Sequence, residues 1–185
     1  MSGFIDVHGH VVLGESMGAA GSVCGPELGT YEDGTPWFRV GDWRLDGVPY
    51  RESLFMQAEL RLEAMDTAGI SLQALSPNPL TYLYWIDQKD AINYCRTHKE
   101  AMGSLVQANK NRFIGFASLP MQNIEASIAE LEYSVKELGL IGGYIGTDFG
   151  TDFDDPRMDA FYAACCELNV PLFIHPAPSG LDGPL

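Results

Sequence analysis

A short apolar stretch near the amino terminus ends in two histidines separated by one glycine. The stretch is Phe4–His10, and its β-branched and aromatic residues predict a strand. Because side chains two positions apart on a strand point to the same side, His8 and His10 are expected to aim two imidazoles at one point. A third histidine, His175, ends another apolar run, Pro171–His175. Imidazoles are common ligands of divalent cations, so the three histidines predict a metal site.

Short β-type runs alternate with helical patterns along most of the chain. The helical pattern is clearest where apolar residues recur every three or four positions, at Ile124, Ile128, Leu131, Val135 and Leu138. Strands are expected at residues 4–8, 70–76, 113–119, 140–146 and 171–175, with helices near 52–68, 88–109, 123–138 and 156–168. Such alternation predicts an α/β fold with a parallel sheet and helical crossovers.

The position of the histidines at strand ends favours one kind of parallel sheet. In a TIM-type (β/α)8 barrel, ligands of a metal lie at the carboxyl ends of the strands. Five strands are fewer than the eight of a closed barrel, so residues 1–185 are expected to form about the first five strands, the N-terminal part of one barrel domain. A complete five-stranded open α/β domain is the alternative, although no glycine-rich phosphate loop follows the first strand.

The segment 11–50 does not follow the strand–helix rhythm. It is rich in glycine and carries two of the three tryptophans, Trp37 and Trp43. After a first barrel strand, a segment of this length is expected to be a loop or small insertion over the active site.

Composition and charge exclude several classes of function. The net charge of −14 disfavours binding to nucleic acid or to an anionic membrane surface, but a metal and one or two arginines would still attract a small anionic substrate. No apolar run of eighteen residues and no signal peptide are recognised. The four cysteines lack a Cys-x-x-Cys spacing, which favours reduced thiols and a cytoplasmic location.

Several short motifs, in order along the chain, match one known family. They are Asp6–His10, Leu72–Ser76, Tyr84–Trp85, Leu119–Gln122, Lys136–Gly139, Ile145–Thr147 and Phe173–Pro176. With these motifs the sequence resembles the metal-dependent amidohydrolase superfamily. Within the amidohydrolase 2 group it is most similar to the aminocarboxymuconate-semialdehyde decarboxylase branch.

The resemblance implies a TIM-type barrel that holds one divalent metal ion, expected to be Zn²⁺. His8 and His10 match the ligands on the first strand of the family, and His175 matches the ligand on the fifth. Arg39 matches an arginine that binds the substrate carboxylate, and Trp85 is expected to wall the substrate pocket. The family's catalytic histidine and a metal-binding aspartate follow later strands, beyond residue 185, so no catalytic residue is assigned.

The resemblance also bears on the reaction and on its substrate. It implies non-oxidative decarboxylation of an unsaturated or aromatic carboxylic acid. A homodimer is expected separately, because the apolar surface left by a half-barrel promotes association with another copy. Ala177 stands after Pro176 where the decarboxylase typically has tryptophan, which leaves the substrate open. Hydrolysis or hydration by the same kind of metal centre is the alternative. A truncated, non-catalytic metal-binding half-barrel is an alternative of another class.

Overall fold

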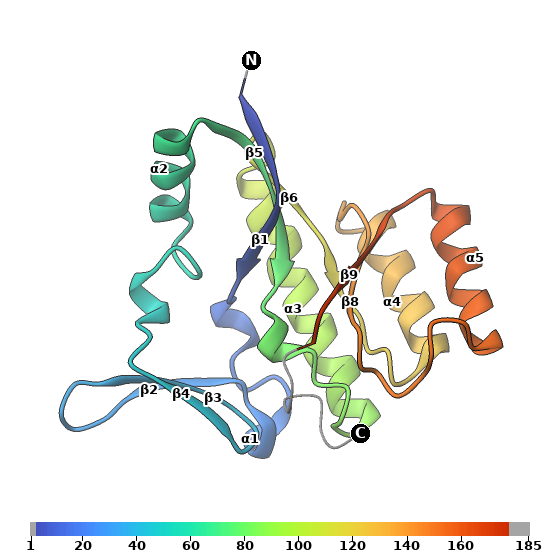
Figure 1. Ribbon diagram of the computed structural model, residues 1–185, viewed down its shortest axis with the longest axis horizontal. Coiled ribbons are helices and arrows are strands. Elements are labelled where there is room, and N and C mark those ends of the chain that lie inside the picture. Colours follow the sequence, from blue (N-terminus) through green and yellow to red (C-terminus); the bar gives the residue numbers. More distant parts are fainter. Residues whose placement is uncertain (1–2, 178–185) are drawn as a thin grey trace.

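The computed structural model describes residues 3–177, which form an α/β fold with parallel strands (Figure 1). One parallel sheet contains β1 (Phe4–Val11), β5 (Ile70–Pro77) and β6 (Phe113–Gly115) in that order. A second contains β7 (Ala117–Ser118), β8 (Gly143–Gly146) and β9 (Leu172–His175). Only Phe116 separates β6 from β7, and its amide nitrogen donates to the carbonyl oxygen of Leu75 on β5. The second sheet therefore continues the strand order of the first.

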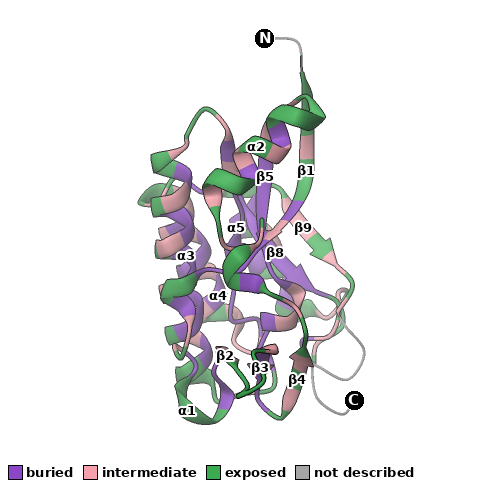
Figure 2. Cartoon of the chain, turned by 90° about the vertical axis from the view of Figure 1, so that its left-hand side faces the viewer, coloured by how far each residue is buried: buried purple, intermediate pink, exposed green. Residues whose placement is uncertain are grey.

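Four helices connect these strands, as the apolar periodicity predicts. They are α2 (Ala58–Ala68), α3 (Gln88–Ala108), α4 (Ile124–Lys136) and α5 (Asp159–Leu168). Asn123 caps the start of α4, because its side-chain oxygen accepts a hydrogen bond from the Ala126 amide at 2.9 Å. Figure 2 shows α3 and α4 on one side of the strands, with their buried residues turned toward the sheet.

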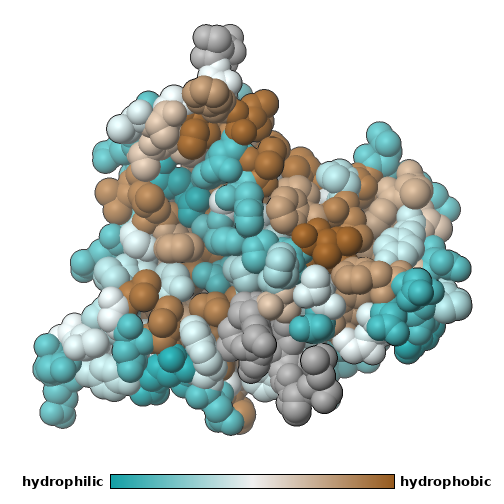
Figure 3. Space-filling view, viewed as in Figure 1, coloured by the Kyte–Doolittle hydropathy of each residue, from teal (hydrophilic) through white to brown (hydrophobic). Residues whose placement is uncertain are grey.

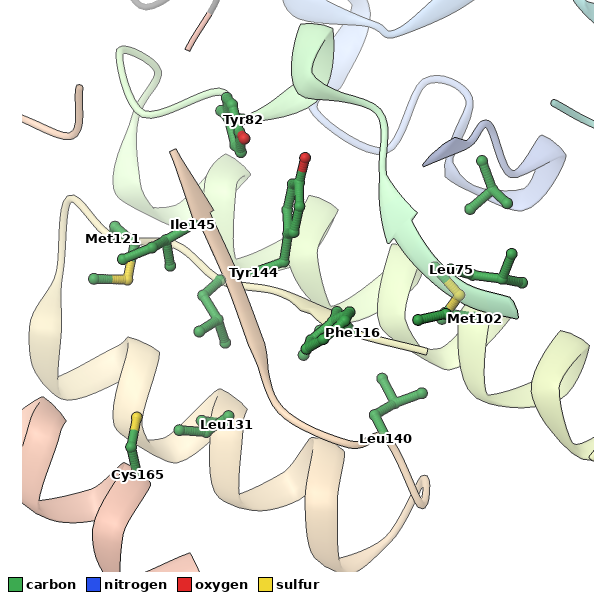
Figure 4. Close-up of a cluster of buried hydrophobic side chains, with 14 of the residues drawn as sticks. Leu75, Tyr82, Met102, Phe116, Met121, Leu131, Leu140, Tyr144, Ile145 and Cys165 are labelled. Atoms are coloured by element: carbon green, nitrogen blue, oxygen red, sulfur yellow. The ribbon is translucent and has the colours of Figure 1, made fainter. Parts of the chain in front are cut away.

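The main hydrophobic core lies between the strands and the helices (Figure 4). Side chains with no exposed surface come from both layers: Leu75, Met102, Phe113, Leu131, Ile145 and Phe161. Burial of each side chain of this size contributes about 1.5–3 kcal/mol. This core fixes the strands whose carboxyl ends carry the histidines.

The segment between β1 and α2 folds into a small sheet of its own. It contains β2 (Glu27–Thr30), β3 (Pro36–Val40) and β4 (Trp43–Asp46), antiparallel and in that order, with the short helix α1 (Gly21–Cys24) before them. Gly41 has a φ of 57° in the turn from β3 to β4, a conformation that favours glycine. Figure 1 places this sheet at the end of the molecule toward which β1 and β5 run.

Within the described residues the parallel strands do not close into a barrel. β1 pairs with β5 on one side, β9 pairs with β8, and no pairing joins β1 to β9. Apolar side chains on these two outer strands are exposed, with Phe4 at 75%, Val7 at 61% and Ile174 at 48% of their surface. Figure 3 shows hydrophobic side chains gathered over both strands.

Three strand predictions differ from the structure in their bounds by more than one residue. The expected strand 4–8 continues to Val11. The expected strand 113–119 is interrupted at Phe116, where the chain passes from one sheet to the other. The expected strand 140–146 begins only at Gly143. Gly142 lies so close to the Pro171 carbonyl that a Cβ atom on it would come within 2.1 Å of that oxygen.

Candidate metal centre

His8, His10 and His175 lie together at the carboxyl ends of β1 and β9. One ring nitrogen from each lies within 4.8 Å of the others. The Nε2 atoms of His8 and His10 are 3.0 Å apart, and the ring centre of His175 lies 5.0 Å from each of the other two ring centres. The structure thus brings together the three histidines that the sequence selects, although 164 residues lie between His10 and His175 in the chain.

An irregularity in β1 shapes this cluster. Asp6 pairs with Gln73 and Gly9 pairs with Leu75, so two residues of β1 stand opposite the single residue Ala74 of β5. A bulge of this kind locally rotates a strand and re-aims its side chains. His8 lies inside the bulge and His10 just after it.

Backbone carbonyls select the protonation form of two of the rings. His10 Nδ1 lies 3.1 Å from the carbonyl oxygen of Pro77, and His175 Nδ1 lies 2.7 Å from that of Pro176. Because a carbonyl oxygen only accepts, each Nδ1 carries the hydrogen and donates it. Each Nε2 then keeps a lone pair, which is the form of histidine that binds a metal.

The electrostatic surroundings keep these rings neutral. Burial and the neighbouring His8 and His175 lower the pKa of His10 to about 4, and burial lowers the pKa of His175. Two nitrogens that share one ion at ~2.1 Å lie roughly 3.0–3.4 Å apart at octahedral to tetrahedral angles. The 3.0 Å between the Nε2 atoms of His8 and His10 fits this range. The His8–His10 pair therefore fits a divalent metal ion, and His175, which has a ring nitrogen within 4.8 Å of theirs, is the third imidazole of the cluster.

Aromatic rings pack beside the histidines. The Tyr144 ring centre lies 5.6 Å from that of His175 and 6.2 Å from that of His10. Tyr82 stacks between Tyr84 and Tyr144 at interplanar angles of 18° and 19°. The stack gives the histidine cluster a flat, largely apolar wall.

Arg39, predicted to bind a carboxylate, contacts acceptors within its own region of the chain. Its guanidinium donates to the carbonyl oxygens of Val23 at 2.8 Å, Gly41 at 2.9 Å and Ser22 at 3.1 Å. It also hydrogen-bonds Glu27 through Nε at 3.3 Å and forms an ion pair with it through Nη2 at 2.8 Å. All five N–H groups of the guanidinium thus face an acceptor. Its role toward a substrate stays a prediction.

Trp85, the other predicted substrate contact, lies beside the same turn. A Cβ atom on Gly41 would come within 2.5 Å of the Trp85 ring, and Trp85 is 42% exposed. Trp85 borders a cavity of about 400 Å³ whose described lining comes from residues 20–24, 85–87 and Asp90 and includes none of the three histidines. Trp85 and Arg39 therefore lie near each other around Gly41, and the role of Trp85 also stays a prediction.

Sequence reasoning missed a buried arginine behind the histidines. Arg61 of α2 is 8% exposed, and its Nη2 donates to the carbonyl oxygen of His10 at 2.5 Å. Its position four residues before Met65, whose side chain is buried, was an available signal, because a charge on the buried face of a helix requires a polar partner.

Comparison with known proteins assigns the chain that carries this site to a family. The profile of the amidohydrolase family (Amidohydro_2) matches residues 5–183. The chain belongs to the amidohydrolase family. Among the described residues of this family member, no helix is both long and apolar enough to cross a bilayer.

Curated relatives of this amidohydrolase chain are decarboxylases by name. It is 35% identical to the 2-amino-3-carboxymuconate-6-semialdehyde decarboxylase of Dictyostelium discoideum, over 71% of this chain and 38% of the relative. It is 31% identical to a gamma-resorcylate decarboxylase of Polaromonas sp., over 71% of this chain and 42% of the relative. The chain therefore spans about two fifths of the length of these relatives.

A solved structure of a Polaromonas enzyme aligns with the whole of this chain. It is a dihydroxybenzoic acid decarboxylase from Polaromonas sp. with bound manganese and the inhibitor 2-nitroresorcinol. The match has a TM-score of 0.72 and 25% identity, and it covers 100% of this chain and 51% of that one.

Proposed function

We propose that this chain is the amino-terminal part of a metal-dependent decarboxylase that acts on an aromatic or unsaturated carboxylic acid. The observation that carries the proposal is the convergence of His8, His10 and His175 at strand ends in a member of the amidohydrolase family. The names of the curated relatives support decarboxylation as the reaction. The acids in those names, an aminocarboxymuconate semialdehyde and gamma-resorcylate, support an unsaturated or aromatic substrate.

The proposal includes a TIM-type barrel of which residues 1–185 supply about the first five strands. The free edges of β1 and β9 support it, because a closed barrel pairs every strand on both sides. The exposed apolar side chains of Val7 and Ile174 support it as well, since further strands and helices would bury them. The coverage of 51% of the Polaromonas structure agrees with this share of a barrel.

His8, His10 and His175 would hold one divalent ion, for which we propose zinc because three imidazoles suit its coordination. When bound, such an ion polarises a substrate oxygen or activates water. The chain's own contribution is to present unprotonated Nε2 atoms, which the Nδ1 contacts of His10 and His175 with carbonyl oxygens favour.

We keep Arg39 and Trp85 as proposed contacts of a small anionic carboxylate, with the segment 11–50 lying over the active site. To bind a substrate, Arg39 would exchange the carboxylate of Glu27 for that of the ligand. The Glu27 side chain is 40% exposed, so releasing it to water costs little. A homodimer and a cytoplasmic location complete the proposal, the latter supported by four free cysteines.

Metal analysis joined to a carbon dioxide assay tests this proposal. The complete native protein, of which this chain is the proposed amino-terminal part, is purified and first analysed for bound zinc and manganese. It is then incubated with gamma-resorcylate, with other hydroxybenzoates and with an aminocarboxymuconate semialdehyde, and released carbon dioxide is measured. We expect one ion per chain and release from at least one acid, lost after chelation and restored by the ion. Metal-bound protein that releases carbon dioxide from none of these acids would contradict the assigned reaction.

A further inference from the structure

Arg61 contacts the histidine segment of β1 from behind. It lies on α2, which packs beside β5 (Figure 2). Its hydrogen bonds to Gln73 of β5 and to His10 of β1 place its side chain between the helix and the sheet. Besides the His10 carbonyl, it donates through Nε to the Leu54 carbonyl oxygen at 2.9 Å and through Nη1 to Gln73 Oε1 at 2.8 Å. Each guanidinium nitrogen therefore has a fixed partner, which holds the group in one orientation.

Gln73 carries the connection from Arg61 to the other metal-site histidine. Its Nε2 donates to Asp6 Oδ2 at 2.6 Å, and Asp6 Oδ1 accepts a hydrogen bond from the backbone amide of His8 at 3.0 Å. One set of hydrogen bonds thus joins Arg61 to the backbone of both His8 and His10. It spans the bulge between Asp6 and Gly9 from end to end.

The same contacts leave no room for a side chain at Gly9, the residue between the two histidines. A Cβ atom on Gly9 would lie 2.7 Å from Gln73 Cδ, 2.9 Å from Gln73 Nε2 and 3.1 Å from Arg61 Nη1. Such distances force neighbouring atoms to move. The His-Gly-His spacing therefore leaves room for Gln73 and Arg61 beneath the bulge, in addition to setting the interval between the two imidazoles.

We propose that Arg61 is a positioning residue for the metal centre. Its guanidinium, acting through the His10 carbonyl and through Gln73 and Asp6, fixes the bulge that aims His8 and His10 at one ion. The inference rests on the metal centre of the proposed function. It adds the residues that hold His8 and His10 in position before an ion binds.

Arg112 provides a matched control for Arg61. It also donates to backbone carbonyls of β5, those of Ser71 and Ile70 at 3.2 Å each, and to a carboxylate, Asp66, at 2.6 Å. These contacts lie at the amino end of β5, whereas the histidines lie at the carboxyl ends of the strands. Loss of Arg112, whose side chain is 30% exposed, therefore removes hydrogen bonds of the same kind at a less buried position without touching the histidine segment.

The test measures cobalt binding to the complete native chain. Co²⁺ is titrated into metal-free wild type, Arg61→Met, Arg61→Lys and Arg112→Met, followed by visible absorption, and the thermal stability of each metal-free protein is recorded. We expect Arg61→Met to weaken cobalt affinity by about 10- to 100-fold and to alter the absorption spectrum. Arg112→Met should keep the affinity and spectrum of the wild type, and Arg61→Lys, which retains one donor for the His10 carbonyl, should bind more tightly than Arg61→Met.

Equal loss of cobalt affinity in Arg61→Met and Arg112→Met, or an unchanged affinity and spectrum in Arg61→Met, would overturn the inference. If Arg61→Met does not fold, Gln73→Leu decides, because it separates the guanidinium from Asp6 and leaves the His10 contact in place. It should weaken cobalt binding, and wild-type binding would overturn the inference. Wild-type protein that binds cobalt but decarboxylates nothing would contradict the proposed reaction alone, whereas wild-type protein that binds no cobalt would overturn both.

Discussion

Two buried groups of charged side chains in this protein differ in what their charges contact. Arg61 directs its guanidinium mainly to neutral acceptors, among them the carbonyl oxygen of a proposed metal ligand, His10. Asp6 is its nearest opposite charge and is reached through Gln73. Burial lowers the pKa of Arg61 to about 10, so the side chain stays protonated near neutral pH.

The second group lies between α3 and α4 and pairs charge with charge. Glu130 accepts hydrogen bonds from Arg96 at 2.6 and 2.9 Å and contacts the ammonium group of Lys99, which has no exposed surface. The Arg96 guanidinium also lies over the ring of Tyr133 at 4.0 Å. These contacts join two helices and include none of the three clustered histidines, His8, His10 and His175.

The difference shows that burial of a charge does not by itself mark a functional site. Glu130, Arg96 and Lys99 contact one another and not the histidine segment, so loss of the Glu130 group should affect folding alone. The Arg61 group leads to the backbone of the histidine segment, so its loss should affect the metal centre. The predictions below separate these two outcomes.

The largest effect is expected from breaking the Glu130 group. Glu130→Ala leaves the buried Lys99 without its partner and should lower the free energy of unfolding by roughly 3–5 kcal/mol, as measured by urea denaturation. Cobalt affinity of the remaining folded protein should not change. Glu132→Ala, which removes an exposed pair with Lys136 on the same helix, should cost about 0.5 kcal/mol or less. Equal costs for the two variants would contradict the assignment.

Removal of a proposed metal ligand should give the opposite pattern. His10→Ala should weaken cobalt binding by on the order of 100-fold or more, with little change in the stability of the metal-free protein. His98→Ala is the control, because His98 is a buried histidine of α3 outside the cluster. It should lower stability and leave cobalt binding unchanged. Retained cobalt affinity in His10→Ala would show that the ion binds elsewhere.

Acid should weaken the Glu130 group in a defined direction. Burial opposes ionisation of Glu130, but hydrogen bonds from Arg96 and Lys99 outweigh it and leave the pKa below the ordinary 4.5. A lowered pKa in the folded state contributes stability that is present above the unfolded value and is lost as the pH falls through the folded value. Between about pH 6 and pH 3, wild type should therefore lose more stability than Glu130→Gln. Parallel losses would mean that other carboxylates determine the acid response.

The smallest effect is expected at Arg39. Arg39→Lys replaces a planar fork with a point charge and should raise the KM for the carboxylate substrate several-fold while metal content stays unchanged. Arg44→Lys is the control on the neighbouring strand, since Arg44 stacks on Trp37 at 4.7 Å and is not a proposed ligand contact. If KM is the same in both variants, the contacts of Arg39 only stabilise the small sheet of β2, β3 and β4.

Much of the fold could be predicted because its signals are local. Buried strands and amphipathic helices carry their periodicity within ten to twenty residues, as Ile124, Ile128 and Leu131 illustrate in α4. The strands β2, β3 and β4 are only four or five residues long and were not expected, since cross-strand contacts define them more than their own sequence does.

The candidate site could be predicted in part. The spacing of His8 and His10 and the strand-end position of His175 were enough to bring the three together. The bulge was not foreseeable, because it depends on Gln73 and Arg61, which lie more than fifty residues away. The surroundings of Arg39 could not be predicted either. The sequence shows that the residue is charged but not which acceptors surround it in the fold.

The central claim is that His8, His10 and His175 hold one ion, and anomalous diffraction tests it most directly. Crystals of the complete protein are grown with zinc or manganese, and data are collected on both sides of the metal absorption edge. The account predicts one strong peak with a nitrogen of each of the three imidazoles about 2.0–2.2 Å away. A fully occupied ion bound elsewhere, with no peak among these histidines, would contradict it.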